Sequence, residues 1–173
     1  MQKILLHICC GICASSVVER LRKEGYEPIG FFYNPNIQPE EEYRQRQETL
    51  KRVAEILKFK LIQPKYTQDI WQEKIKGLEN EPEGGARCLV CFRLRLEEAR
   101  ARAAGMKLTK FTTTLTVSPH KNSAAINQIG KAIDPDGFLA FDFKKQDGFK
   151  LAIQFAERYN LWRQHYCGCS YSR

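Results

Sequence analysis

Three cysteines lie within five positions near the start of the chain: Cys9, Cys10 and Cys13. They follow the short apolar run 4–8, and the residues after them repeat apolar side chains at helical spacing. A strand that turns into a helix presents backbone N–H groups at the positive end of the helix dipole, which favours anionic thiolates. Because thiolates, and not thiols, bind metals, this turn is a candidate active site. Burial as small core side chains explains one cysteine more readily than three.

Cys88 and Cys91 form a second group, a CxxC pair that opens an expected helix directly after the polar loop 79–86. This spacing lets both sulfurs reach one metal or cluster from a single helical turn. The two groups offer five candidate ligands, and four thiolates are sufficient for a 4Fe–4S cluster. The adjacent Cys9 and Cys10 are unusual for zinc fingers and favour iron–sulfur, but a structural zinc site with four cysteines stays open.

Cys10 and Cys13 also form a CxxC pair between a strand and a helix, the arrangement of thioredoxin-type proteins. Such a pair exchanges disulfides, and the helix N-terminus stabilises the first thiolate. A thiol–disulfide oxidoreductase is therefore an alternative function. It leaves Cys88, Cys91 and the cysteines of the tail without a role.

Cys167 and Cys169 in the C-terminal tail are separated by Gly168 alone. A disulfide between them closes a very small ring, and strained disulfides have more oxidising potentials and tend to be catalytic or labile. Glycine relieves the restriction on the backbone. The pair can therefore serve as a reversible two-electron store, although two further metal ligands or two incidental tail cysteines remain alternatives.

Short apolar runs and amphipathic segments alternate along the chain, the pattern of a parallel sheet flanked by helices. We expect one α/β domain without a linker or repeat. After the cysteine turn a helix should end at Gly25, with later helices over 40–57, 68–78, 87–105, 124–133 and 148–159 and strands over 29–33, 58–63, 110–115 and 138–143.

Polar side chains follow two of the expected strands, where parallel sheets bind their substrates. Tyr33 and Asn34 end the strand 29–33. Ser118, His120 and Lys121 lie in the loop after the strand 110–115. We expect these five side chains to contact substrate.

The net charge is +8 over 173 residues. Clustered Lys and Arg gain affinity for phosphates by releasing counterions, so a nucleic acid is a plausible partner. No apolar run approaches the length of a membrane span, and there is no secretion signal pattern. Seven cysteines in a reducing, cytoplasmic location indicate metal or redox chemistry. The basic residues fall on two polar patterns, Arg44, Arg46, Lys51 and Arg52, and Arg93, Arg95, Arg100 and Arg102, to which we add Lys144 and Lys145 as candidate phosphate contacts.

With these residues in view, the chain resembles the QueH-type epoxyqueuosine reductases. The matching motifs run from one end of the chain to the other: LHICCGICA at 6–14, FYNPNI at 32–37, EY at 42–43, RCLVCFRLRL at 87–96, FTTTL at 111–115, SPHK at 118–121 and YCGC at 166–169. One departure is Ile12, where the family's CCGPC has Pro; it supplies no sulfur.

The resemblance implies an oxidoreductase of tRNA processing. Its members reduce epoxyqueuosine to queuosine at the wobble position of the tRNAs for Tyr, His, Asp and Asn, the last step of queuosine biosynthesis. The expected partner is a tRNA anticodon stem-loop, with no membrane and an electron donor that neither the residues nor the resemblance identifies. The alternative from another functional class, a binding protein instead of an enzyme, is a noncatalytic, zinc-stabilised RNA-binding module.

The resemblance also assigns the cysteines. It implies a redox-active disulfide between Cys167 and Cys169, and an additional iron ion could use the remaining Cys13. Because one cluster moves single electrons, either of these could supply the second electron that the epoxide needs. The implied 4Fe–4S ligands are Cys9, Cys10, Cys88 and Cys91.

The fold implied by the resemblance is Rossmann-like, similar to the group that includes the PP-loop ATPases (adenine nucleotide alpha hydrolases). We therefore expect a single iron–sulfur α/β domain over 1–173, with 161–173 as a redox-active tail. This chain has Cys-Cys-Gly-Ile-Cys where those ATPases carry a phosphate loop. We expect neither ATP nor cobalamin as a cofactor.

Overall fold

A four-stranded parallel sheet forms the centre of the molecule in the computed structural model, which describes residues 1–172. The strands are β1 (Gln2–His7), β2 (Tyr26–Phe31), β3 (Leu61–Ile62) and β4 (Phe111–Thr113), in the order β3-β2-β1-β4. All three neighbouring pairs are parallel, with Leu5 beside Ile29 on one side and beside Phe111 on the other. The central strand β1 is fully buried from Ile4 to His7, because helices cover both faces of a parallel sheet.

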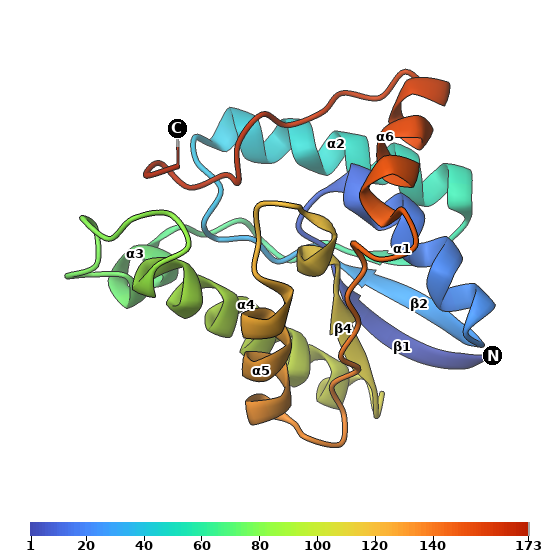
Figure 1. Cartoon of the computed structure of the whole chain (residues 1–173), viewed down its shortest axis with the longest axis horizontal. Coiled ribbons are helices and arrows are strands. Elements are labelled where there is room, and N and C mark those ends of the chain that lie inside the picture. The colour runs from blue at the N-terminus through green and yellow to red at the C-terminus, as the bar shows by residue number, and fades with distance from the viewer. Residues whose placement is uncertain (173) are drawn as a thin grey trace.

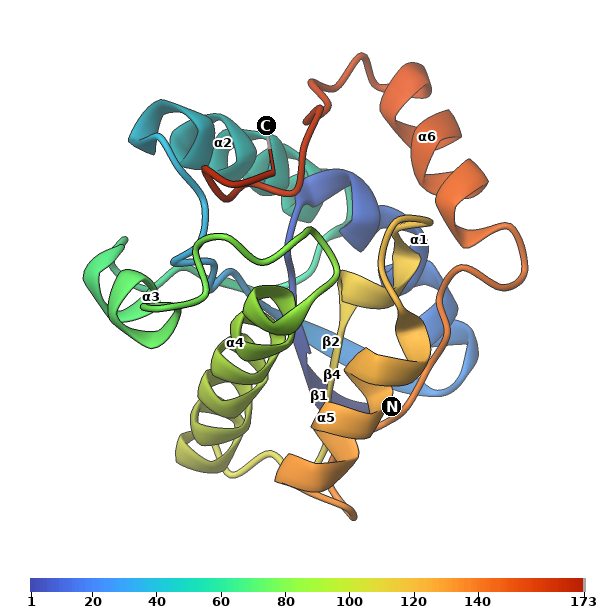
Figure 2. The ribbon, with the colours of Figure 1, turned by 60° about the vertical axis from the view of Figure 1, so that its left-hand side comes forward.

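Three helices, α1 (Gly11–Lys23), α2 (Glu40–Leu57) and α6 (Gly148–Arg158), cover one face of the sheet. The other face carries α4 (Ala86–Gly105) and α5 (Ser123–Ile133), which lie side by side (Figures 1 and 2). The short α3 (Asp69–Lys74) packs against the start of α4. The C-terminal tail leaves α6 and runs along α2 toward the beginning of that helix (Figure 1).

Most of the expected elements are present. Helix α2 has the predicted bounds. Helix α1 is followed by Gly25, whose φ of +89° is a left-handed backbone conformation that glycine adopts without strain. The third strand is shorter than predicted, with two residues. Strand β4 also ends early, because its chain tightens into the 3-10 helix η1 (Thr114–Val117). No helix in the described part of the chain is both long and apolar enough to cross a membrane.

The predicted fifth strand over 138–143 is wrong. Phe138 makes an isolated parallel bridge to Phe111, and the Leu139 N–H donates to the Phe111 carbonyl. The chain then leaves the sheet edge, and Phe141 and Phe143 stack on each other beside the Arg20 guanidinium. The run is apolar because Phe138 packs against Phe111 and Gly130 while Phe141 and Phe143 pack beside Arg20 of α1, and such packing does not require a strand.

Candidate metal and redox site

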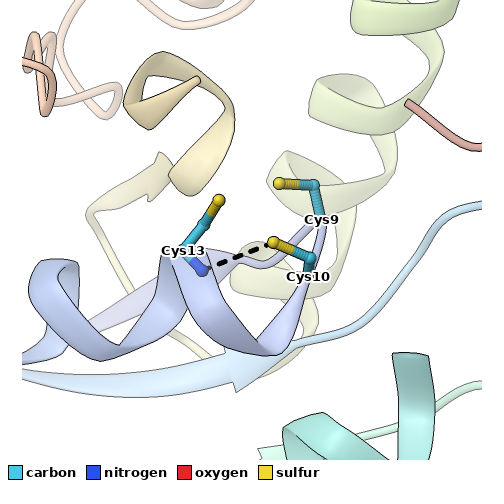
Figure 3. A group of neighbouring side chains, drawn as sticks. All are labelled: Cys9, Cys10 and Cys13. Carbon is cyan, nitrogen blue, oxygen red and sulfur yellow. Dashed lines mark hydrogen bonds between the residues drawn. The ribbon is translucent and has the colours of Figure 1, made fainter. Parts of the chain in front are cut away.

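The cysteine turn lies between the carboxyl end of β1 and the first turn of α1, as the sequence predicts. The sulfurs of Cys9, Cys10 and Cys13 all lie within 4.8 Å of one another, and they face one common space (Figure 3). All three cysteines are buried. Sulfurs bound to one tetrahedral ion at 2.3 Å would be roughly 3.8 Å apart. The observed group is therefore close to what a single thiolate-bound metal requires.

Regular structure and one neighbouring helix hold this turn in place. Cys10 is the N-cap of α1, and its Sγ accepts the Cys13 N–H at 3.3 Å. Gly11 lies against α2: a Cβ there would be 2.9 Å from the Leu50 nitrogen. Cys9 donates its backbone N–H to Thr114 Oγ1 at 3.0 Å, while its Sγ lies 3.2 Å from the same oxygen. The sulfur positions therefore depend on the sheet, α1 and α2 together.

The three thiols do not titrate alike. Hydrogen bonds from Cys10 and Cys13 lower the pKa of Cys9 well below its usual value, against the effect of burial, with further help from the Lys121 charge and Thr114. The hydrogen bond with Cys13 lowers the pKa of Cys10, but Cys9 and burial raise it to about 12. Hydrogen bonding to Cys10 and Cys9, with burial, raises the pKa of Cys13. Cys9 therefore has the lowest pKa of the three thiols, and a metal that bound the group would displace the protons of its neighbours.

Cys88 and Cys91 lie on the first turns of α4 and line a second cavity of about 230 Å³. Cys88 Sγ accepts the Gly84 N–H at 3.2 Å. Burial raises the pKa of Cys91, while the Arg95 charge and the Trp71 indole oppose it.

Two buried N–H groups beside this second cavity have no partner among the described residues: Trp71 Nε1 and Arg87 Nε. Both side chains are 1% exposed. Buried donors without partners are costly, and a negatively charged group such as thiolate or sulfide would satisfy them. The donors and sulfurs around this cavity therefore fit an iron–sulfur group.

The tail cysteines form a third group. Cys167 Sγ and Cys169 Sγ lie 3.9 Å apart, and Ser172 Oγ lies 2.9 Å from Cys167 Sγ. The hydrogen bond with Cys169 and that with Ser172 lower the pKa of Cys167 to about 4, although burial opposes the shift. The same pairing with Cys167, and burial, raise the pKa of Cys169. The pair is thus a thiolate beside a thiol.

Cys167 belongs to the walls of two cavities. The larger cavity, of about 600 Å³, is lined by the cysteine turn, and the smaller one by Cys88 and Cys91. The residues that line both are Glu83, His120, Lys121 and Cys167. The three cysteine groups, predicted from separate parts of the sequence, therefore line two neighbouring cavities that share these four residues.

The predicted substrate residues fall into two sets. Ser118, His120 and Lys121 line the larger cavity, beside the cysteine turn. Tyr33 and Asn34 instead line a small separate cleft. The Asn34 amide donates to the Ile8 carbonyl at 2.8 Å, so this side chain braces the end of β1.

Sequence reasoning missed several residues of the larger cavity. Phe149 and Ile153 reach it from α6, and Arg163, His165 and Tyr166 reach it from the tail. His165 and Tyr166 lie next to Cys167 in the sequence, and this proximity could have identified them. Nothing local marks Phe149, which enters the cavity because α6 packs on α1.

Three of the predicted phosphate contacts are occupied elsewhere. Arg46 and Arg95 are 1% and 3% exposed. Lys144 Nζ donates to the carbonyls of Thr116 and Lys121 and to the Ser123 hydroxyl. These side chains hold the protein together, so the prediction that they bind phosphates is wrong.

Comparison with known proteins agrees with this geometry. A family model described as epoxyqueuosine reductase QueH matches residues 4–173. The chain belongs to the QueH family of epoxyqueuosine reductases. The epoxyqueuosine reductase QueH of Acinetobacter baylyi is 39% identical over 174 residues, which cover 98% of this chain and 80% of that protein. The QueH of Thermotoga maritima is 32% identical over 178 residues, covering 99% and 91%.

Solved structures confirm the predicted fold class. A predicted subunit of tRNA methyltransferase from Methanocaldococcus jannaschii superposes with a TM-score of 0.59 at 16% identity, covering 88% of this chain and 74% of that one. NMN synthetase from Francisella tularensis gives 0.58 at 12% identity, covering 95% and 66%. This chain therefore has an α/β fold of the predicted class.

Proposed function

We propose that this chain reduces epoxyqueuosine to queuosine at the wobble position of tRNA, in the cytoplasm. Family membership supports the reaction. The observation that carries the proposal is that cysteines from 9–13, 88–91 and 167–169 line two cavities that share Cys167 and Lys121. Neither alternative, a thiol–disulfide oxidoreductase or a zinc-stabilised module, needs all three groups.

Cys9, Cys10, Cys88 and Cys91 are the proposed ligands of a 4Fe–4S cluster, and Cys13 is available to an additional iron ion. The lowered pKa of Cys9 and the unpartnered donors of Trp71 and Arg87 support this assignment. When bound, such a cluster would pass electrons on one at a time, and the additional iron ion would act as a Lewis acid on an epoxide oxygen.

Reduction of the epoxide breaks two C–O bonds, forms a C=C bond and releases the oxygen as water, so it consumes two electrons and two protons. The Cys167 thiolate and Cys169 thiol supply two electrons and one proton when they close to a disulfide. The second proton has a source in the Lys121 ammonium, which lines both cavities. A separate reductant then reopens the disulfide for the next turnover.

The larger cavity is the proposed nucleoside site. Its volume, about 600 Å³, is in the range of small-molecule sites. Enzymes that act on a base take it out of the stack and hold it between apolar or aromatic side chains. Phe149, which is 38% exposed, and Ile153 provide such a wall opposite the cysteine turn. Arg163 and His165, at the same cavity, suit the phosphates of an anticodon loop.

Anaerobic turnover of an epoxyqueuosine-containing anticodon stem-loop tests the proposal. Protein reconstituted with iron and sulfide, given a chemical reductant, should convert the nucleoside to queuosine, detected by mass spectrometry as the loss of one oxygen. Cys167→Ser should lose multiple turnover. No conversion by fully reconstituted protein would contradict the proposed function, and full multiple turnover by Cys167→Ser would remove the dithiol from it.

A further inference from the structure

The tail turn that carries Cys167 and Cys169 has no strand or helix to hold it. Its position depends on contacts with α2 and the loop before α2, and on the burial of Cys169 among Trp71, Ile75 and Cys91 of the α3–α4 region. Gly168, between the two cysteines, has φ +123°, and a Cβ there would be 2.9 Å from Ile37 and 3.1 Å from Arg46 Nη1. The turn is thus pressed directly against these two side chains.

Arg46 makes the decisive contacts. Its Nη1 donates to the Cys167 carbonyl at 2.9 Å and its Nη2 to the Tyr166 carbonyl at 2.8 Å. Its Nε donates to Glu42 at 2.9 Å, one helical turn away on α2. The guanidinium also lies 5.4 Å from the centre of the Tyr166 ring. Each of the three nitrogens of this buried guanidinium therefore donates a hydrogen bond.

The loop before α2 also forms hydrogen bonds with the tail turn. The Gln38 N–H donates to the Gly168 carbonyl at 2.8 Å, and the Tyr166 hydroxyl donates to the Gln38 carbonyl at 2.5 Å. Three successive carbonyls, of Tyr166, Cys167 and Gly168, are thus bound from α2 and its preceding loop. Two of the three depend on Arg46.

We propose that Arg46 is a positioning residue for the reaction: it fixes the Cys167–Gly168–Cys169 turn so that Cys167 lies on the wall common to both cavities, within disulfide-forming reach of Cys169. This inference rests on the proposed function of that pair. A buried, bidentate arginine suits the task because its planar, rigid fork holds two donors in a fixed geometry toward two carbonyls, whereas a lysine offers a single flexible point charge.

Arg22 is a matched control, because it makes the same kind of contacts at the opposite edge of the sheet. It pairs with Glu27 and donates to the Leu57 carbonyl at 2.7 Å and the Lys58 carbonyl at 3.3 Å. A variant there removes a comparable set of hydrogen bonds far from the cysteines. Arg46→Gln, Arg46→Lys and Arg22→Gln should therefore be compared in protein reconstituted with iron and sulfide.

Three readouts separate positioning from general stability. In Arg46→Gln, alkylation of the reduced Cys169, which is 4% exposed in the intact fold, should become about tenfold faster, while Cys10 and Cys13 stay protected. The equilibrium constant for closing the Cys167–Cys169 disulfide against glutathione should fall about tenfold, or ~30 mV for a two-electron couple. For the stem-loop, kcat should fall and KM should not change. Arg46→Lys should be intermediate, and Arg22→Gln should match the wild type.

An Arg46→Gln variant with the wild-type rate of Cys169 alkylation and the wild-type Cys167–Cys169 potential would overturn the inference. Equal changes in Arg22→Gln would also overturn it. Alkylation of Cys10 and Cys13 in Arg46→Gln would do the same, because it would report unfolding. Because alkylation and potential are measured without substrate, they decide the role of Arg46 even if Cys167→Ser shows that the reaction does not need the dithiol.

Discussion

The two cysteine groups that meet at the larger cavity are positioned by different means. Cys9, Cys10 and Cys13 are placed by regular structure: the last residues of a buried strand and the first turn of a helix. Cys167 and Cys169 lie in an irregular tail and are placed by side-chain contacts to their backbone. Disturbing the first group should therefore cost stability of the whole fold, whereas disturbing the second should cost activity alone. The predictions below test this difference.

Cys9→Ser should have the largest effect. The substitution removes the thiol of lowest pKa in the buried group and replaces it with a hydroxyl that binds iron poorly. We expect kcat for the stem-loop to fall at least ~100-fold, together with a loss of bound iron. Steady-state kinetics and iron analysis of the same anaerobic preparation check both. Wild-type iron content and turnover would show that Cys9 is not a ligand.

Gly11→Ala should destabilise the entire fold. The added Cβ would lie 2.9 Å from the Leu50 nitrogen and 3.1 Å from the Thr49 carbonyl carbon, so α1 and α2 must move apart. Such overpacking costs about 1–3 kcal/mol, measured as a lower urea midpoint. Gly105→Ala is the control, because a Cβ at Gly105 meets no atom within 4 Å. An unchanged midpoint for Gly11→Ala would mean that the cysteine turn is not packed tightly against α2.

Gly168→Ala should show the opposite behaviour. A left-handed φ of +123° and the approach to Ile37 and Arg46 make alanine strained at this position. Because the turn lies outside the sheet and its helices and is held by contacts to its backbone, the strain should release the turn and leave the core intact. We expect about a tenfold loss of kcat, from roughly 1.4 kcal/mol of strain, with the urea midpoint of the wild type. A midpoint that falls as far as in Gly11→Ala would remove the distinction between the two groups.

Phe149→Ala should have the smallest effect. Loss of a stacking surface for one base should raise KM for the stem-loop about fivefold, the lower end of the range for base–aromatic contacts, with kcat retained. Phe149→Trp should restore binding. Leu151→Ala is the control, because Leu151 is more exposed on the same helix, 47% against 38%, and is not among the residues that line the cavity. Equal effects of the two alanine variants would argue against a specific stacking role.

The same contrast explains what the sequence could predict. The strand, turn and helix around Cys9–Cys13 follow from a local hydrophobic pattern and cap signals, so their placement was predictable. Sequence patterns also predicted α2 with its observed bounds. The aromatic run 138–143 was misassigned, because its side chains pack beside Arg20 and only Phe138 bridges to the sheet.

The role of Arg46 could not be predicted, because its contacts join residues about 120 positions apart. On a helix with exposed Arg44 and Arg52, it is indistinguishable by type from a solvated cation. Tyr33 and Asn34 show the same limit: the predicted strand 29–33 ends earlier, at Phe31, and the loop that follows turns these two residues toward a separate cleft. Long-range contacts decided each of these outcomes.

Metal and sulfide analysis tests the central claim most directly, namely that cysteines from distant parts of the chain hold one iron–sulfur centre. Wild-type protein purified anaerobically should contain iron and acid-labile sulfide, and the double variant Cys88→Ser, Cys91→Ser should lose both. Zinc alone in the wild type, or full iron and sulfide content in the double variant, would contradict the account.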